Sequence, residues 1–170
     1  RRRHTRYWRD WSSDVCSSDL LHGSCLWTGL PRPTELAFDV PLGGRMLPCR
    51  IWTAKLPDSE VPAYFLENGD LFGRDQPEFG RSLYQFSGTD GSKRDYPDNG
   101  ERFAFFCHAL VQAIRALGWW PDVLHCNDWQ TGLAPVYLRE HFGRHPDPSV
   151  ASAWKDRKST RLNSSHANIS

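Results

Sequence analysis

The sequence predicts an α/β fold, and three observations in its middle carry that prediction. A short apolar run at residues 122–126 ends in polar residues, and apolar residues at helical spacing resume at Thr131, so 121–138 is expected to form a strand, a loop and a helix. Upstream, apolar residues recur at three- and four-residue steps over 101–117, which indicates another helix. The resulting strand–helix–strand–helix order is typical of doubly wound sheets, where ligands bind beyond the carboxyl ends of the strands.

The segment before these helices is expected to be β-rich. Residues 21–44 carry Pro, Gly and short apolar pieces, with one strand near 35–40. Residues 45–56 and 61–66 contain β-branched and aromatic side chains bounded by turn formers, which predicts two strands. The separator PDSE at 57–60 favours a hairpin between them.

Residues 67–97 are predicted to form a long, ordered and partly packed loop. The loop is rich in Gly, Asp and Ser and contains scattered aromatic residues, which serve either ordinary packing or the stacking of sugars. The helix at 101–117 is then expected to be capped by Asp98 or Asn99 and to end at Gly118. The second helix tolerates Pro135 only near its first turn and is expected to end at Gly143.

Composition sets limits on the class of protein. The 170 residues are 39% hydrophobic and 24% charged, as in an ordinary globular domain, and no apolar run is long enough to span a membrane. The five cysteines are unevenly spaced, which favours free thiols and a cytoplasmic protein. A formal charge of +1 lacks the basic excess that nucleic-acid binding needs.

The two ends of the chain differ from its middle. DWSSDVCSSDL at 10–20 and DRKSTRLNSSHANIS at 156–170 look like the two strands of a common sequencing adapter read as protein. Residues 1–20 and 156–170 are therefore expected to be non-native and disordered, which leaves 21–155 as one partial domain. Without the ends, 13 basic and 16 acidic residues remain, a net charge of −3, so the basic arm is no sign of a nucleic-acid or membrane partner.

The polar residues after the strand at 122–126 are the candidates for chemistry. His125 at the strand end could donate to a ligand hydroxyl, or it could be a satisfied core histidine. Asp128 is a candidate for ligand binding and also for capping the next helix. Gln130 and Thr131 lie where backbone N–H groups at a helix start could meet an anionic or hydroxylated ligand.

Other site types find little support in the sequence. The pairs Cys107–His108 and His125–Cys126 point in different directions on a helix and a strand, so neither is expected to hold a metal ion. No Walker loop, nucleophile elbow or dinucleotide fingerprint occurs, and residues 21–44 do not provide the glycine pattern of an NAD-dependent oxidoreductase.

Three stretches carry a family resemblance. They read YFLENGDLFGR at 64–74, DYPDNGERFAFFCHA at 95–109 and PDVLHCNDWQTGLAPVYL at 121–138. They resemble the amino-terminal domain of bacterial glycogen synthases and plant starch synthases, and the resemblance spans most of 51–144. It implies a Rossmann-like domain of the glycosyltransferase B arrangement. It also implies a retaining glucosyltransferase that extends an α-1,4-glucan from ADP-glucose without a metal or other cofactor.

The resemblance also implies roles for individual residues. His125 is expected to be an active-site residue that contacts the donor glucose. Four further residues are expected to line or support the cleft: Asp98, Asn127, Asp128 and Trp129. Gln130, at a position where many relatives carry His, and Thr131 complete the expected substrate-binding set.

Parts of the family pattern are not found in this chain. The K-x-G-G-L loop expected before Leu21, the threonine-isoleucine-histidine-asparagine motif expected after Val150 and the carboxy-terminal domain are missing. That domain supplies the basic residues on the ADP phosphates, so the chain is expected to be an inactive piece of a synthase. The alternative is a non-catalytic glucan-binding module that uses the aromatic loop at 67–96.

Overall fold

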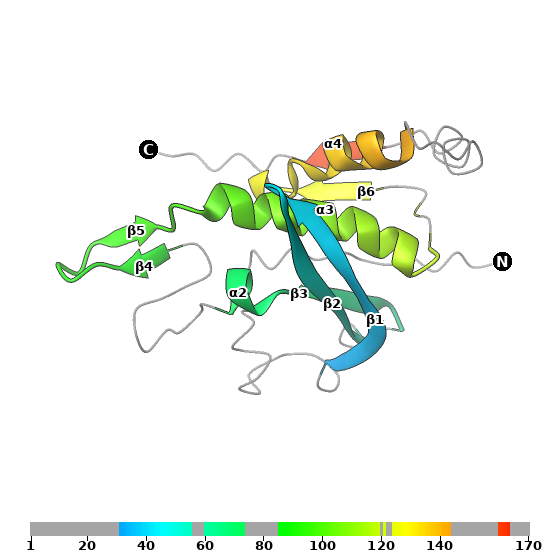
Figure 1. Ribbon diagram of the computed structural model, residues 1–170, viewed down its shortest axis with the longest axis horizontal. Helices are drawn as coiled ribbons and strands as arrows, with labels where there is room; N and C mark the ends of the chain where they lie inside the picture. Colours follow the sequence, from blue (N-terminus) through cyan, green and yellow to red (C-terminus); the bar gives the residue numbers. More distant parts are fainter. Residues whose placement is uncertain are drawn as a thin grey trace. The chain divides into compact units, whose positions relative to one another are not determined.

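The computed structural model describes residues 31–55, 60–73, 85–119, 121, 124–143 and 160–163 (Figure 1). Contacts divide the chain into two compact units, residues 1–102 and 103–170. The predictions for residues 1–30, for most of the turn at 57–60 and for the segments 144–159 and 164–170 lie outside the described residues. That one partial domain spans 21–155 stays a prediction.

A three-stranded antiparallel sheet forms the centre of the first unit. Its strands are β1 (Arg32–Leu42), β2 (Arg45–Lys55) and β3 (Pro62–Glu67), in that spatial order (Figure 1). The pairing of Lys55 with Pro62 confirms the predicted hairpin between β2 and β3. The β1–β2 hairpin turns at Gly43 and Gly44, whose φ angles of 57° and 77° suit a two-residue loop that glycine fills without steric cost.

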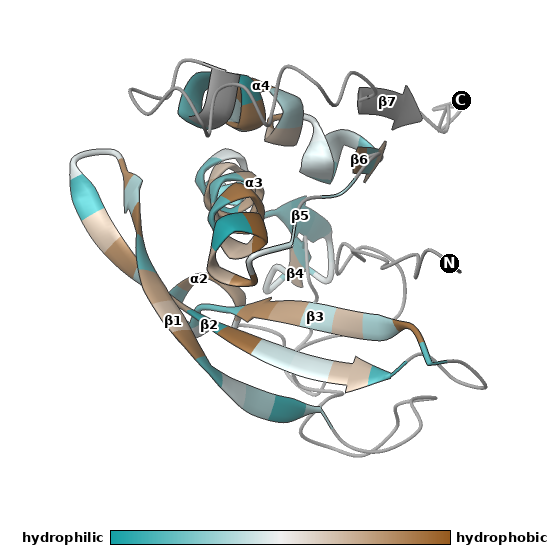
Figure 2. Ribbon diagram, turned by 90° about the vertical axis from the view of Figure 1, so that its right-hand side faces the viewer, coloured by the Kyte–Doolittle hydropathy of each residue, from teal (hydrophilic) through white to brown (hydrophobic). Residues whose placement is uncertain are grey.

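One face of this sheet is buried. Cys49 and Ile51 are buried while Arg50 between them is exposed, and Leu66 of β3, which pairs with Ile51 and so lies on the same face, is buried as well. Figure 2 shows this mixture as brown and pale segments along β2 and β3. The apolar face therefore follows from the alternation of β-branched and aromatic residues in the sequence.

The segment predicted as a long loop contains regular structure in its described part. Helix α2 (Gly69–Phe72) is capped by the buried Asn68, whose side chain accepts from Leu71 N at 3.0 Å. Further on, β4 (Gln85–Ser87) and β5 (Lys93–Asp95) form an antiparallel ribbon. The ribbon forms because a tight turn connects its two strands. In this turn the backbone N–H of Gly91 donates to Gly88 O at 2.9 Å, and Gly91 has the positive φ of 75° that the turn requires.

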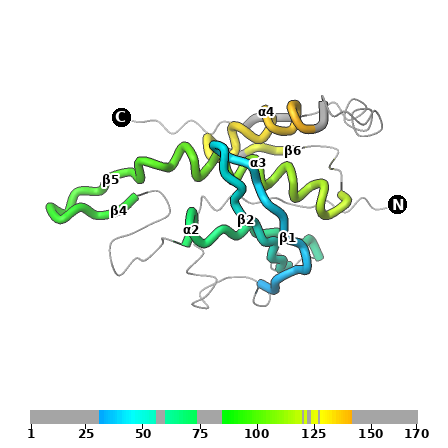
Figure 3. Tube along the Cα trace, viewed as in Figure 1, coloured from blue at the N-terminus to red at the C-terminus, as the bar shows by residue number. Residues whose placement is uncertain are grey.

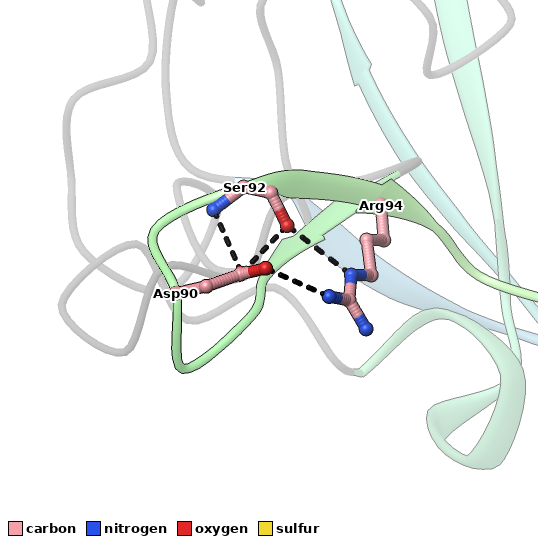
Figure 4. Close-up of polar contacts among 3 residues, drawn as sticks. All are labelled: Asp90, Ser92 and Arg94. Carbon is pink, nitrogen blue, oxygen red and sulfur yellow. Dashed lines mark hydrogen bonds and ion pairs between the residues drawn. The ribbon is translucent and has the colours of Figure 1, made fainter.

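Side-chain hydrogen bonds reinforce this ribbon (Figure 4). The carboxylate of Asp90 accepts from the N–H of Ser92 at 3.0 Å and from its hydroxyl at 2.6 Å, and Arg94 donates to the same carboxylate at 2.9 Å. The hydroxyl of Ser92, followed by its backbone N–H, holds the pKa of Asp90 below its usual range. The turn is thus stabilised by polar groups rather than by a buried core.

Helix α3 (Asn99–Ala116) corresponds to the helix predicted at 101–117. Its carboxyl end is a Schellman motif, because Gly118 N donates to Arg115 O at 3.0 Å and Trp119 N donates to Ile114 O at 3.2 Å. Gly118 has φ 59°, which confirms it as the residue that ends the helix. Residues 105–111 are all buried, which is more than the single stripe that the helical periodicity predicts.

After α3 the second unit continues with the predicted strand and helical segment (Figure 3). The strand is β6 (Leu124–Asn127), followed by a 3₁₀ turn η2 (Trp129–Thr131), helix α4 (Ala134–Leu138) and a π-helical turn η3 (Arg139–Gly143). The single helix predicted from Thr131 is therefore divided into three helical types. Pro135 lies in the first turn of α4, as expected, and Gly143 is the last residue of η3.

Strand β6 pairs in parallel with β7 (Thr160–Asn163), from Leu124 opposite Thr160 to Asn127 opposite Asn163. These four residues belong to the segment 156–170, for which disorder was expected. Backbone groups on an open strand edge can pair with almost any extended segment, so strand pairing here requires no native partner sequence. In the described part of the chain, β3 and β6 belong to different sheets, and β6–β7 is the parallel pair.

Candidate functional site

His125 is on the solvent-exposed face of β6. Its neighbours Leu124 and Cys126 are buried, at 4% and 2% exposure, while the imidazole is exposed. Side chains alternate between the two faces of a strand, so His125 and Cys126 point in opposite directions. Cys126 is buried, which raises the pKa of its thiol to about 11, whereas His125 is accessible from the solvent.

Asp128 follows β6 in an unusual backbone conformation. It has φ 61° and ψ −178°, and its carboxylate accepts a hydrogen bond from Trp129 N at 2.7 Å. The expected capping role is therefore present, although the capped element is the η2 turn. A residue with a side chain adopts this region only when the surrounding structure enforces it, and such residues gather at functional sites.

Trp129 presents an indole ring to solvent. The residue is 54% exposed, and its ring meets Phe103 of α3 edge to face, with ring centroids 4.8 Å apart and planes at 75°. One side of the indole is thus supported by a buried aromatic ring. An exposed, fixed aromatic face is the type of surface that binds the apolar face of a sugar ring.

Gln130 and Thr131 are buried rather than presented to a ligand. The thiol of Cys107 donates to the backbone carbonyl of Gln130 at 3.1 Å. The hydroxyl of Thr131 donates to Asp128 O at 3.1 Å, so it serves the turn. The side chain of Asn127 lies outside the described part of the structure.

Helix α3 packs against Trp129 and Gln130, a contact that was not predicted from the sequence. Phe103 and Cys107 are four residues apart on one face, and they contact the consecutive residues Trp129 and Gln130. One residue further, the buried His108 stacks on Tyr137 of α4 with ring centroids 4.5 Å apart. The four-residue spacing of Phe103 and Cys107 was the available signal for these contacts.

Asp98 belongs to the first unit, whereas the 125–131 loop belongs to the second. Asp98 precedes α3 and is half-buried, and its backbone carbonyl accepts from Arg102 N at 2.9 Å. The Oδ1 of the neighbouring Asn99 accepts from the guanidinium of Arg102 at 2.7 Å. Arg102 is only 1% exposed, and its burial was not predicted from the sequence.

No group of three or more His, Cys, Asp or Glu side chains within the described ranges is arranged to hold a metal ion. None of the helices in the same ranges combines the length and the hydropathy of a bilayer-spanning segment.

The exposed His125 in β6, Asp128 with its positive φ and the indole of Trp129 follow one another at the carboxyl end of a strand, the edge at which α/β proteins commonly bind ligands. Residues 27–152 match the family model of the starch synthase catalytic domain, so the chain belongs to this family. It is 45% identical over 107 residues to the glycogen synthase of Syntrophotalea carbinolica, covering 63% of this chain and 19% of that protein. It is 38% identical over 115 residues to glycogen synthase 2 of Geobacter metallireducens, covering 68% and 21%.

A similar solved structure comes from a plant. The catalytic domain of starch synthase IV from Arabidopsis thaliana, bound to ADP and acarbose, aligns with a TM-score of 0.46 and 19% identity, over 78% of this chain and 22% of that chain. The chain thus spans about a fifth of the length of the first two curated relatives.

Proposed function

We propose that this chain is part of a glycogen or starch synthase that transfers glucose from ADP-glucose to the non-reducing end of an α-1,4-glucan. The observation that carries the proposal is the family match over residues 27–152. The names of the two similar bacterial proteins, both glycogen synthases, support it. The exposed imidazole of His125 in β6 is consistent with such a reaction, because the reacting sugar needs an accessible hydrogen-bonding group.

In this proposal His125 is the catalytic residue that contacts the donor glucose. Its imidazole is exposed and can donate to a sugar hydroxyl while it accepts from another. Trp129 offers its exposed indole to a sugar ring. Asp128 orients the backbone of Trp129 by accepting a hydrogen bond from its N–H. The remaining members of the proposed substrate-binding set are Asp98, Asn127, Gln130 and Thr131.

We further propose that the chain alone does not catalyse transfer. Stabilisation of the leaving ADP phosphates by fixed cations is a large part of such catalysis, and it would come from the other domain of the synthase. Three described cysteines, Cys49, Cys107 and Cys126, are free and buried, which supports a protein of a reducing compartment such as the cytoplasm.

The experiment is a chimera in which residues 32–143 of this chain replace the matching segment of the Syntrophotalea carbinolica enzyme, which is 45% identical. We expect the chimera to extend glycogen from radiolabelled ADP-glucose, and the isolated chain to transfer no measurable glucose. His125→Ala in the chimera should lower kcat/KM about 100-fold or more, because a donor aimed at the reacting group is lost.

Arg115→Lys is the matched control, since Arg115 is an exposed residue in the last turn of α3 and should leave kcat/KM unchanged. A chimera that folds but transfers no glucose would contradict the proposed function. Equal activity of the chimera with and without His125 would remove that residue from the catalytic role.

The alternative of a glucan-binding module receives less support from the described aromatic residues of the 67–96 segment. Phe72 is buried, and Phe86 and Tyr96 pack against each other with ring centroids 5.4 Å apart. Among the described residues of this segment, these rings serve packing. Titration of the isolated chain with maltohexaose measures whether binding occurs without turnover.

A further inference from the structure

The guanidinium of Arg102 is buried between two aromatic rings of the first unit. Its Cζ atom lies 5.2 Å from the ring centroid of Phe72 and 5.0 Å from that of Tyr96. Both distances are within the range of cation–π attraction, which is stronger when water is excluded. The residue is only 1% exposed, so the cation is held by protein groups rather than by solvent.

The same guanidinium donates to two oxygens from different segments. Nε donates to the backbone carbonyl of Leu71 in α2 at 2.7 Å, and Nη1 donates to Oδ1 of Asn99 at 2.7 Å. Charge-assisted hydrogen bonds of this length are roughly twice as strong as neutral ones. Arg102 therefore joins α2 to the turn at residues 96–99, named here the Asp98 turn.

The connection extends from α2 to the sheet. Asn68 accepts from Leu71 N at 3.0 Å and donates through Nδ2 to Pro48 O of β2 at 2.8 Å. The Asp98 turn is also closed by Asn99 N, which donates to Tyr96 O at 3.1 Å. A continuous set of polar contacts thus runs from β2 through Asn68 and Leu71 to Arg102 and Asn99.

Lysine could not replace arginine in this arrangement. An ammonium group is a point charge, whereas the planar guanidinium presents donors in a fixed fork and stacks on aromatic faces. Only the planar group can lie between the rings of Phe72 and Tyr96 and still reach Leu71 O and Asn99 Oδ1 at once. The buried charge of Arg102 is tolerated because two hydrogen-bond acceptors and two aromatic rings surround it.

We infer that Arg102 is a positioning residue that fixes the Asp98 turn on α2 and so holds Asp98 in place for the substrate. The importance of Asp98 rests on the function proposed above, whereas the order of the turn is a property of the isolated chain. Loss of the contact to Asn99 would free the turn while α3 itself remains helical, since the backbone bond from Arg102 N to Asp98 O needs no side chain.

The test compares ¹⁵N-labelled chains of the native sequence with Asn99→Ala, Asn99→Asp, Arg102→Lys and the exposed control Arg115→Lys. Asn99→Ala removes the acceptor of Arg102, whereas Asn99→Asp keeps an oxygen in its place. The heteronuclear NOE of the Asp98 amide should fall in Asn99→Ala and Arg102→Lys and stay native in Asn99→Asp and Arg115→Lys. The Nε–H signal of Arg102 should be protected from exchange in the native chain.

Titration with maltohexaose, followed at the Asp98 amide, provides the second measurement. The dissociation constant should rise about tenfold in Asn99→Ala and stay within about twofold in Asn99→Asp, as expected for one charge-assisted hydrogen bond. A native NOE for Asp98 in both Asn99→Ala and Arg102→Lys would overturn the inference, as would equal disorder in Asn99→Ala and Asn99→Asp. If no variant responds to maltohexaose but the NOE pattern is as expected, the positioning role stands and glucan binding by this chain fails.

Discussion

The carboxylate of Asp128 accepts a hydrogen bond from the backbone N–H of Trp129 at 2.7 Å, while Asp128 itself has φ 61° and ψ −178°. Glycine dominates this backbone region, and a residue with a side chain there is strained by about 1–3 kcal/mol. The strain is located between the exposed His125 and the exposed Trp129. Local stability is lower at the place where we propose that the substrate binds, as is common for functional loops.

Two substitutions of Asp128 should distinguish the effect of backbone strain on the free energy of unfolding from the effect of the lost cap. Asp128→Ala loses the cap and keeps the strain, so it should lower the free energy of unfolding by about 1 kcal/mol. Asp128→Gly also loses the cap but relieves about 1–3 kcal/mol of strain, so it should be more stable than Asp128→Ala by about 1–2 kcal/mol. Urea unfolding of both variants measures the difference.

Asp128→Asn is the control for this comparison, because its side-chain oxygen still accepts from Trp129 N and its side chain has the same shape as aspartate, so the backbone strain is unchanged. It should unfold within about 0.5 kcal/mol of the native chain. An Asp128→Ala chain as stable as Asp128→Gly would show that the backbone is not strained at this residue.

Trp129 should matter more for glucan binding than for stability. Trp129→Ala loses the edge-to-face contact with Phe103, worth about 0.5–1.5 kcal/mol, and only about half of the side-chain surface that it removes is buried, since the residue is 54% exposed. The affinity for maltohexaose should fall about tenfold or more with loss of a stacking ring. Thermal unfolding and calorimetric titration measure the two effects on the same samples.

Val136 provides the matched control for Trp129. It is 53% exposed and lies in the following helix α4, so Val136→Ala removes exposed apolar surface without removing an aromatic face. Its affinity for maltohexaose should be native. Equal losses of affinity in Val136→Ala and Trp129→Ala would attribute binding to general apolar surface and argue against stacking on the indole.

The parts of the fold that the sequence predicted are those specified by local periodicity. Helix α3 was predictable because its apolar residues recur at helical steps and Gly118 supplies its carboxyl end. The β4–β5 ribbon was not predictable from alternation, because Lys93–Asp95 are all exposed and the turn at Gly91 holds the strands together. The β1–β2 hairpin had its signal in Gly43 and Gly44, two glycines that suit a tight turn.

The candidate site shows the same division between local and distant causes. The exposure of His125 follows from strand alternation, which a short segment determines. The conformation of Asp128 depends on how α3 holds the next two residues, through Phe103 and Cys107. The burial of Arg102 depends on Leu71, 31 residues earlier, so no local pattern could identify a charged residue as part of the interior.

Gly100 in α3 and Gly118 just beyond its carboxyl end give predictions of opposite sign. Gly118 has φ 59° and no atom within 4 Å of an added Cβ, so Gly118→Ala should destabilise the chain by about 1 kcal/mol through backbone strain alone. Gly100 lies in the first turn of α3, equally without neighbours at Cβ. Gly100→Ala should therefore stabilise the chain by about 0.5–1 kcal/mol through helix propensity.

Thermal unfolding of the two variants measures these effects, with the double variant as the control for independence. The residues lie at opposite ends of one helix, so their changes should add within about 0.5 kcal/mol. A stabilised Gly118→Ala chain would contradict the assignment of Gly118 as the left-handed residue of the Schellman motif.

Alkaline pH should destabilise the chain through two buried thiols. Burial raises the pKa of Cys49 to about 12 and that of Cys126 to about 11, whereas the ordinary value is 9.0. Between pH 9 and 11 the unfolded chain has lost these protons and the folded chain still holds them. The stabilisation is therefore complete below pH 9 and is lost as the pH rises, by up to about 1.4 kcal/mol per pH unit for each thiol.

Urea unfolding at pH 8, 9, 10 and 10.5 measures this slope, and Cys49→Val identifies the share of one thiol. Valine is apolar and suits strand β2, so the variant should fold and should lose stability less steeply above pH 9 than the native chain. An unchanged slope would mean that Cys49 does not titrate differently in the folded and unfolded chains. Iodoacetamide provides an independent check, because a thiol that stays protonated at pH 9 should be alkylated only after unfolding.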